Sequence, residues 1–507
     1  MRRFRIACLA LAIASAGTAA CSAILGLDPP PSQDAGAAPD ATAPSDASID
    51  GADESTTPDS ATTPPVCMLL DAGGSDAAIY TALDDSTAWE LFDTNALSGF
   101  PATGYIGGTF DGRYVYFAGR SNRLSRYDTM GGGFATPSAW SEFAVGPLGA
   151  VGGFGGAAFD GRYVYFVPDE IATTIESVVA RFDTQGSFTA DTSWATFDLS
   201  TLSADGGAVT SGMLGAVFDG RFLYFVPHSD GAPDGRVVRY DTSGLLDAGA
   251  PGDAGDAGDA GDAGDGGESG AMIAFDEPSR WSTFDVSSTN PVATGFAGGV
   301  FAAGDLYLVP DYNDAFDAQV HGGGSGTVAR YAVDAGFATS GSWSTFDTTL
   351  VNGFADGDWG GAFDGQFVYL VPHDEAIVTR FDTTTPFGSI SSWSAYDTTR
   401  VSTLDGGGLP GYSGGAFDGR FIYLVPGATA TIVRYDVTST FTADCAWSTF
   451  DLGQLPDGGV PLPEFNGAVF DGQYLYVIPY GNGLFARFDA KSPAPLPNLP
   501  AFHGSFL

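Results

Sequence analysis

The chain has 507 residues, of which 61 are acidic and 20 are basic, so its formal net charge at pH 7 is −41. A surface of this sign repels the phosphate backbone, which argues against nucleic acid as a partner.

The first twenty residues have the pattern of a secretory signal peptide. A basic start, Met1–Arg5, precedes an apolar run at 6–16 that is too short to span a membrane. Thr18-Ala19-Ala20-Cys21 resembles the lipobox of bacterial lipoproteins, although that family prefers Leu at the position of Thr18. The resemblance implies a lipid on Cys21, and Ser22 implies sorting to the outer membrane. Ordinary cleavage near Ala16 is the alternative.

Residues 21–75 form a spacer of Ala, Asp, Pro, Ser and Thr with few large apolar side chains. Such a segment cannot bury enough surface to offset its conformational entropy, so we predict a disordered tether. We therefore expect an exported outer-membrane lipoprotein, periplasmic or on the cell surface, whose only membrane attachment is the lipid. A Pro-rich tail at 493–507 ends the chain.

A repeated motif, Phe-Asp-Gly-(Arg/Gln)-aromatic-x-Tyr, dominates the region between these ends. Clean copies begin at Phe110, Phe159, Phe218, Phe363, Phe417 and Phe470. A degraded seventh copy occupies 301–307, and most copies are 49 to 62 residues apart. This spacing predicts an array of one supersecondary unit.

Each unit contains four short runs that are rich in β-branched and aromatic residues, which we call strands a to d in chain order. Asp-Gly between the first two runs predicts a type I′ hairpin, in which both turn residues have positive φ. Val-Pro ends strand b, strand c reads Val433-Arg434-Tyr435-Asp436 in one copy, and strand d begins at a Trp. Repeated four-stranded antiparallel units are typical of β-propeller blades.

The tryptophans give the number of blades. Strand d begins at Trp89, Trp140, Trp194, Trp281, Trp343, Trp393 and Trp447. The first of these precedes every a–b hairpin, and the last hairpin has no Trp strand after it. We therefore predict an all-β, seven-bladed propeller over 76–492 that is closed by an N-terminal strand, which removes the open edges of the array.

From about residue 80 to 490 the order of these motifs resembles the kelch repeat. The likeness consists of a tight a–b turn, a Tyr-containing b strand, Arg-aromatic-Asp and then Trp. The chain departs from kelch where Val-Pro replaces the Gly-Gly that closes strand b, and Gly-Gly stands before strand a instead, as at 360–361. The resemblance implies a propeller and leaves the function open, since kelch-like propellers bind proteins, bind sugars or catalyse.

An insertion and two cysteines add local expectations. Gly-Asp-Ala triplets at 246–270 interrupt blade 3 between strands c and d, and we expect a solvated acidic loop there. A calcium site is the alternative, although the spacing matches neither an EF-hand loop nor the calcium nonapeptide. Export permits a disulfide between Cys67 and Cys445, which would join blade 7 to blade 6; two free thiols are the alternative.

Polar residues that recur in every blade are expected to be structural. The strand c arginines are Arg126, Arg181, Arg239, Arg330, Arg380, Arg434 and Arg487. We expect their guanidinium groups to pair with Asp residues of adjacent turns or strands. The Asp of each a–b turn has the same structural interpretation.

Function is sought where the blades differ, at the residue that follows strand b. Around the ring this position holds Arg120, Asp169, His228, Asp311, His373, Gly427 and Tyr480. These residues, with Trp359 in a d–a loop, are the candidate ligand-binding ring at the mouth of the central channel. Loop side chains that face solvent are the alternative interpretation.

The expected function is a monomeric binding module for a protein or glycan. No His-x-His or His-Glu-x-x-His motif occurs in the chain, and no stretch shows the helical period that a strand-turn-helix nucleophile elbow needs, so we expect no catalytic residues, no metal and no other cofactor. A metal held by two or three histidines with carboxylates on this face is the alternative. An exported carbohydrate-active lyase or hydrolase that uses the same face is the alternative function.

Overall fold

A computed structural model describes most of the repeat region. Described are residues 79–492 except 98–103, 151, 172–173, 176, 205–206, 209–211, 230–231, 244–273, 314–323, 402–410, 428 and 456–463. The predicted signal peptide, Cys21, the tether, the 246–270 insertion and the 493–507 tail lie outside the described residues. Within them, helical geometry is limited to short 3₁₀ turns, and no helix has the length and apolar character that a membrane span requires.

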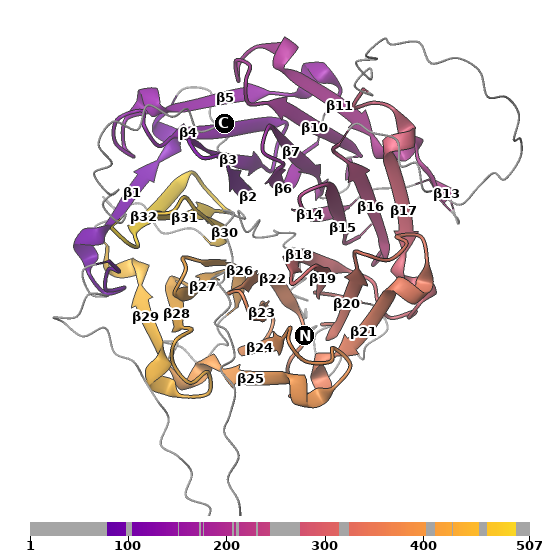
Figure 1. Cartoon of the computed structure of the whole chain (residues 1–507). Helices are drawn as coiled ribbons and strands as arrows, with labels where there is room; N and C mark the ends of the chain where they lie inside the picture. The colour runs from indigo at the N-terminus through magenta and orange to yellow at the C-terminus, as the bar shows by residue number, and fades with distance from the viewer. Residues whose placement is uncertain are drawn as a thin grey trace, which may run out of the picture.

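Seven four-stranded antiparallel sheets form a ring, which confirms the predicted all-β, seven-bladed fold (Figure 1). The innermost strands are β2 Tyr105–Phe110, β6 Phe154–Phe159, β14 Met213–Phe218, β18 Phe296–Ala302, β22 Asp358–Phe363, β26 Tyr412–Phe417 and β30 Phe465–Phe470. The second strands are β3 Tyr114–Gly119, β7 Tyr163–Pro168, β15 Phe222–Pro227, β19 Asp305–Pro310, β23 Phe367–Pro372, β27 Phe421–Pro426 and β31 Tyr474–Pro479. The third strands are β4 Arg123–Asp128, β10 Val178–Asp183, β16 Arg236–Asp241, β20 Thr327–Ala332, β24 Ile377–Asp382, β28 Thr431–Asp436 and β32 Leu484–Asp489. The outer strands are β5 Trp140–Ala144, β11 Trp194–Asp198, β17 Trp281–Asp285, β21 Trp343–Asp347, β25 Trp393–Asp397, β29 Trp447–Asp451 and β1 Trp89–Asp93.

The seventh sheet combines the two ends of the described region. Its strand order is β1-β32-β31-β30, and Trp89 pairs in register with Phe488. In the other six sheets all four strands come from one continuous stretch of the repeat. Two short hairpins lie outside the blades: β8 Glu170–Ile171 with β9 Thr174–Ile175, and β12 Ser203–Ala204 with β13 Gly207–Ala208.

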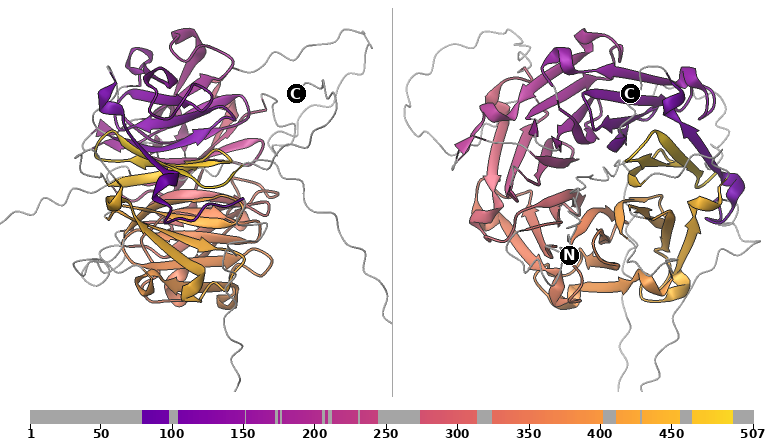
Figure 2. Two further views of the ribbon diagram at one scale, coloured as in Figure 1. Left: turned by 90° about the vertical axis from the view of Figure 1, so that its left-hand side faces the viewer. Right: turned by 180° about the vertical axis from the view of Figure 1, so that it is seen from behind.

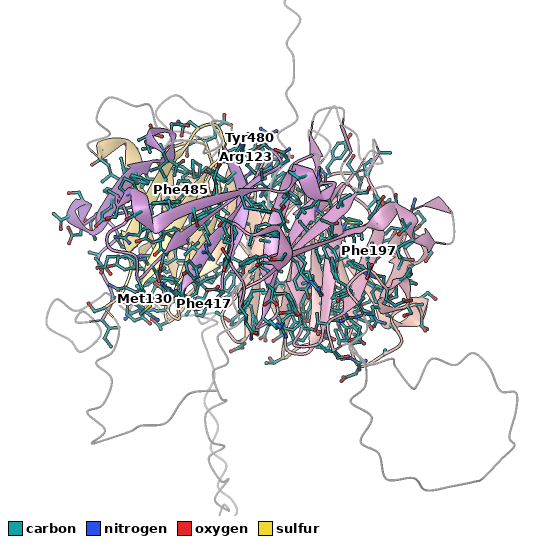
Figure 3. The ribbon with its side chains drawn as sticks, turned by 90° about the horizontal axis from the view of Figure 1, so that it is seen from above. Arg123, Met130, Phe197, Phe417, Tyr480 and Phe485 are labelled. Carbon is teal, nitrogen blue, oxygen red and sulfur yellow. The ribbon has the colours of Figure 1, made fainter. Side chains whose placement is uncertain are left out.

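The two faces of the ring carry different connections. Figure 2 shows the disc from its side and from behind. Tyr480, just after the second strand of blade 7, lies at one face, while Met130 and Phe417 lie at the other (Figure 3). The residues that follow the second strands therefore gather on the face opposite the Asp-Gly turns.

The tryptophans that begin the outer strands hold neighbouring blades together. Each indole Nε1 donates to the backbone carbonyl six residues earlier, at 2.9–3.2 Å. Each indole also stacks on an aromatic ring of the preceding blade's outer strand, with ring centroids 4.2–5.5 Å apart. These stacks bury large apolar surfaces and explain why every blade requires a Trp at this position.

The a–b turns differ from the predicted type I′ geometry in six blades. In blade 1 only Gly112 has positive φ, whereas the turn aspartate does not. The Asp111 carboxylate instead accepts the backbone N–H groups of Arg113 and Tyr114 at 2.8 and 2.6 Å, and the Tyr116 hydroxyl at 2.7 Å. Only the degraded turn of blade 4, Ala303-Gly304, has positive φ at both residues. The type I′ prediction is therefore wrong for the Asp-Gly turns, because the aspartate side chain satisfies the turn's donors.

The predicted pairing of the strand c arginines with aspartates is also wrong for most blades. In six blades the guanidinium carbon lies 4.0–4.2 Å from the centre of an aromatic ring. In blade 4 Arg330 does pair with Asp305, at 2.9 Å. The structural interpretation holds, but the contacts are chiefly cation–π.

A buried turn carboxyl gives a pH-dependent contribution to stability. Burial raises the pKa of Asp418 in blade 6 above its usual range, and this outweighs the lowering by the N–H groups of Phe421 and Arg420. The folded state therefore holds this proton more tightly than the unfolded state, and the contribution is lost as the pH rises through the raised pKa. We expect wild type to lose stability relative to Asp418→Asn as the pH rises from about 4 to about 7. Urea unfolding at several pH values measures the difference; one that does not vary with pH contradicts the expectation.

The structure describes only one of the two cysteines of the predicted disulfide. Cys445 lies in the 3₁₀ turn η13, Asp444–Ala446, just before β29, and it is disulfide-bonded. Cys67 lies outside the described residues, so the pairing of Cys67 with Cys445 stays a prediction.

Candidate functional site

The seven predicted ring residues occupy equivalent places at the face of the disc that carries Tyr480. In each blade, the backbone N–H of this residue donates to the carbonyl of the residue just before the innermost strand, at 2.8–3.4 Å. This bond extends the pairing of the two inner strands by one step. It places the ring side chains beside the start of the innermost strand, where the blades meet around the axis.

These side chains are more buried than a solvent-facing loop would allow. Asp169 is 1% exposed, Asp311 is 6% exposed and Tyr480 is 8% exposed. The solvent-facing interpretation is therefore wrong for these three residues, because inner-strand pairing continues through them. Arg120, His228 and His373 are half-buried.

The ring residues form two contacting groups, one in blades 1 and 7 and the other in blades 3 and 4. On one side, the Arg120 guanidinium lies over the Tyr480 ring, 4.3 Å from its centre. Burial and the nearby Asp169 carboxylate raise the pKa of the Tyr480 phenol, against the lowering by Arg120. On the other side, His228 Nε2 lies 3.1 Å from Asp311 Oδ2.

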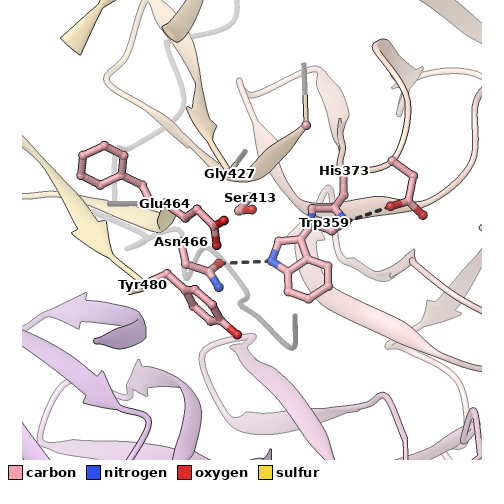
Figure 4. A pocket seen from close by; sticks show the side chains of 10 residues that line it. Trp359, His373, Ser413, Gly427, Glu464, Asn466 and Tyr480 are labelled. Carbon is pink, nitrogen blue, oxygen red and sulfur yellow. Dashed lines mark hydrogen bonds and ion pairs between the residues drawn. The ribbon is translucent and has the colours of Figure 1, made fainter. Parts of the chain in front are cut away.

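The second group continues into blade 5. Asp311, His373 and Asp374 each offer one ligand atom, and these atoms lie within 4.8 Å of one another; we call the three residues the axial cluster. Figure 4 shows the contact between His373 Nδ1 and Asp374 Oδ1, which is 3.2 Å long. Burial lowers the pKa of the His373 imidazole, but the Asp374 hydrogen bond and the Asp311 charge outweigh it, so the pKa is raised.

Trp359 belongs to a strand and not, as predicted, to a loop. It is the second residue of β22, is 2% exposed and packs with Leu214 and Ala297 of blades 3 and 4. Its indole N–H donates to Asn466 Oδ1 of blade 7 at 3.3 Å (Figure 4). The His373 ring lies 4.7 Å from the indole, centroid to centroid. Trp359 therefore connects blades across the axis and leaves little of its ring for stacking on a ligand.

Asp358 was expected in a blade 5 loop near the ring and was not counted among the ring residues. It begins β22, at a position that is apolar or aromatic in the six other blades: Tyr105, Phe154, Met213, Phe296, Tyr412 and Phe465. Its side chain is fully buried, and burial together with the charges of Asp356 and Asp311 raises its pKa well above the usual range. A comparison of the first residue of each inner strand, in addition to the residue after strand b, would have found it.

A pocket of about 440 Å³ adjoins the axial cluster. It lies among blades 5, 6 and 7 and is lined by Trp359, His373, Asp374, Gly411, Ser413, Gly427, Glu464, Phe465, Asn466 and Tyr480. Figure 4 shows Tyr480, Asn466 and Ser413 around it. Aromatic rings, hydroxyls, an amide and carboxylates thus share one concave surface, which suits a small polar ligand.

The comparisons with known proteins assign the chain to no family. No family model and no curated protein matches the chain. Among solved structures, a streptogramin B lyase is 13% identical with a TM-score of 0.48, covering 79% of this chain and 98% of that one. A catalytically inactive virginiamycin B lyase from Staphylococcus aureus with quinupristin is 12% identical with a TM-score of 0.49, covering 79% and 99%. A selenomethionine form of the Staphylococcus aureus enzyme is 11% identical with a TM-score of 0.49, covering 79% and 98%.

Proposed function

We propose that this protein is an exported, lipid-anchored propeller that binds a glycan in the pocket of blades 5, 6 and 7. The tether at 21–75 and a lipid on Cys21 would hold the propeller at the outer membrane. The expected scaffold is a kelch-like repeat: its blades are nearly identical, but the residues that they present on one face differ. A monomer is sufficient for this role.

The Tyr480 hydroxyl is the observation that carries the proposal. It belongs to a residue that lines the pocket, and the one neighbour that acts on it is the Arg120 guanidinium, a donor, so the phenol O–H has no acceptor in the described part of the chain. Leaving such a group unsatisfied costs about 1–3 kcal/mol, which a ligand hydroxyl would recover. A pocket of about 440 Å³ has room for a small ligand such as a few sugar units, whereas a folded protein needs a broad contact surface rather than a pocket.

Two substitutions test this function. Tyr480→Phe and Ser413→Ala each remove one hydroxyl and keep the side-chain packing. We expect the double variant to bind the glycan about tenfold more weakly, because each lost hydrogen bond contributes about 0.5–1.5 kcal/mol. Binding of the full chain to an array of polysaccharide fragments, followed by calorimetry on the best fragment, provides the measurement.

Gln473→Ala is the matched control, since Gln473 belongs to the same blade but follows the Asp-Gly turn on the opposite face. It should leave glycan affinity unchanged. Equal affinity of the double variant and wild type would place the ligand elsewhere. Shortening of the bound fragment, detected by mass spectrometry, would replace the binding function with the alternative of a carbohydrate-active lyase or hydrolase.

A further inference from the structure

The axial cluster combines an imidazole with two carboxylates at metal-ligand separation. Asp311 and Asp374 come from the second-to-third strand loops of blades 4 and 5, and His373 directly follows β23. Their potential ligand atoms lie within 4.8 Å of one another. Carboxylate oxygens and imidazole nitrogens are the usual ligands of divalent transition metals.

Asp358 provides a second, independent indication of a cation site. Its side chain is 0% exposed, and neither carboxylate oxygen has a hydrogen-bond partner in the part of the chain that the structure describes. The carboxylates of Asp356, Asp311 and Asp374 are close enough for their negative charges to disfavour its ionised form. A buried carboxylate in this situation requires either a proton or a bound cation.

The backbone around Asp358 brings the carboxylates of blade 5 together. Gly357 has a φ of +64°, and a Cβ at that position would lie 2.8 Å from Asp374 Oδ2. The Gly357 carbonyl also accepts the backbone N–H groups of His373 and Asp374, at 2.8 and 3.2 Å. The start of β22 and the end of β23 are thereby held side by side at the axis.

His228 approaches the same carboxylates from blade 3. Its Nε2 lies 3.1 Å from Asp311 Oδ2, and its side chain is 16% exposed. A residue that holds a ligating carboxylate in this way fixes the orientation of the ligand without contacting the metal. The axial cluster therefore provides the potential ligands, and His228 supports one of them.

We propose that the axial cluster, together with Asp358, binds one divalent transition-metal ion of the Zn²⁺ or Mn²⁺ type. The imidazole favours such an ion over Ca²⁺, which takes six to eight oxygen ligands. The ion neutralises carboxylates that would otherwise repel one another. Because His373 and Asp374 also line the pocket, the ion lies at the pocket wall, where the hydroxyls of a bound ligand can reach it.

Metal titration of the full chain, without any glycan, tests this inference separately from the proposed function. The protein is stripped with a chelator and titrated with Zn²⁺, Mn²⁺, Mg²⁺ or Ca²⁺ in a calorimeter. We expect Zn²⁺ or Mn²⁺ to bind one ion per chain at this site and to raise the thermal midpoint. Asp358→Asn and His373→Ala should each remove that ion, and His228→Ala should weaken it about 10- to 100-fold.

Asp169→Asn is the matched control, because Asp169 is equally buried and occupies the same ring position as Asp311, in blade 2. It should retain the ion, and any ions bound to the Gly-Asp-Ala segment at 246–270 should remain in every variant. Chelated Asp358→Asn should also be more stable than chelated wild type near pH 7, which shows that the variant is folded. Wild type that binds no ion, stoichiometry that is unchanged in both ligand variants, or a Ca²⁺ site that is insensitive to His373→Ala would overturn the inference.

Discussion

Replacement of Trp89 by alanine should lower the free energy of unfolding by about 3–5 kcal/mol, although Trp89 lies near the start of the described region. Its indole donates to the Leu83 carbonyl at 3.0 Å and stacks on Phe450 and Phe488, with ring centroids 5.5 and 4.7 Å away. Phe450 belongs to blade 6, so the substitution loosens the contact between blades 6 and 7 as well as the outer edge of blade 7. Urea unfolding monitored by circular dichroism measures the loss.

Trp343→Ala provides the comparison for this prediction. Trp343 makes the equivalent contacts in blade 4, where all four strands are continuous in sequence. If β1 stabilises blade 7 as much as β21 stabilises blade 4, the two variants lose similar free energies of unfolding. A loss below about 1 kcal/mol for Trp89→Ala, with the full loss for Trp343→Ala, would contradict a structural role of β1 in closing the ring.

Arg420→Gln should cost about 2–3 kcal/mol, whereas the same substitution at Arg113 should cost less than about 1 kcal/mol. Both arginines follow an Asp-Gly turn and pair with the last residue of strand c: Arg420 with Asp436, and Arg113 with Asp128, each at 2.8 Å. The side chain of Arg420 is 7% exposed and that of Arg113 is 53% exposed. Weakening a buried pair leaves a charge poorly compensated, whereas water compensates the exposed one.

The chain contains natural versions of this substitution. Gln366 and Gln473 occupy the same position in blades 5 and 7 and donate to Asp382 and Asp489, at 3.4 and 3.1 Å. Glutamine therefore fits the turn, and a larger cost at Arg420 than at Arg113 reflects the burial of the pair beneath Tyr80 and Phe421. Chemical denaturation of the two single variants checks the difference; equal losses would show that burial does not decide the strength of the pair.

The two ends of the described region cover the a–b turn of blade 6, and this is why that turn differs from the turn of blade 1. Tyr80 forms an isolated bridge with Lys491 and packs edge-on against Phe421, with ring centroids 5.5 Å apart. The Lys491 ammonium donates to the Asp418 carbonyl at 2.6 Å. These residues cover a turn that remains open to solvent in blade 1, and no local feature of the repeat indicates this.

The repeated part of the fold follows from local sequence. Short alternating runs, glycine at the turn and a Trp every blade predict strands whose pairing is mostly between neighbours in sequence. The errors concern side-chain partners: the Asp111 carboxylate accepts backbone N–H groups of the turn, and Arg126 packs over the Tyr114 ring rather than pairing with an aspartate. Such choices depend on which groups the packed blades leave within reach.

The candidate site was only partly predictable. His228, Asp311 and His373 were found because they break the repeat at one position, but their mutual distances depend on how three blades pack around the axis. The burial of Asp358 and of Trp359 was not predicted, because both residues were assigned to a loop and both belong to β22.

By itself, the sequence determined that the chain forms seven four-stranded antiparallel blades and that one face carries different residues in each blade. Periodicity suffices for this, because strand pairing within a blade is local and repeats. Only the tertiary structure decided that Asp358 is buried against the axial cluster, that Trp359 reaches Asn466 and that Arg420 is covered. These contacts join residues from separate blades or from the ends of the described region, and their burial depends on the closed ring.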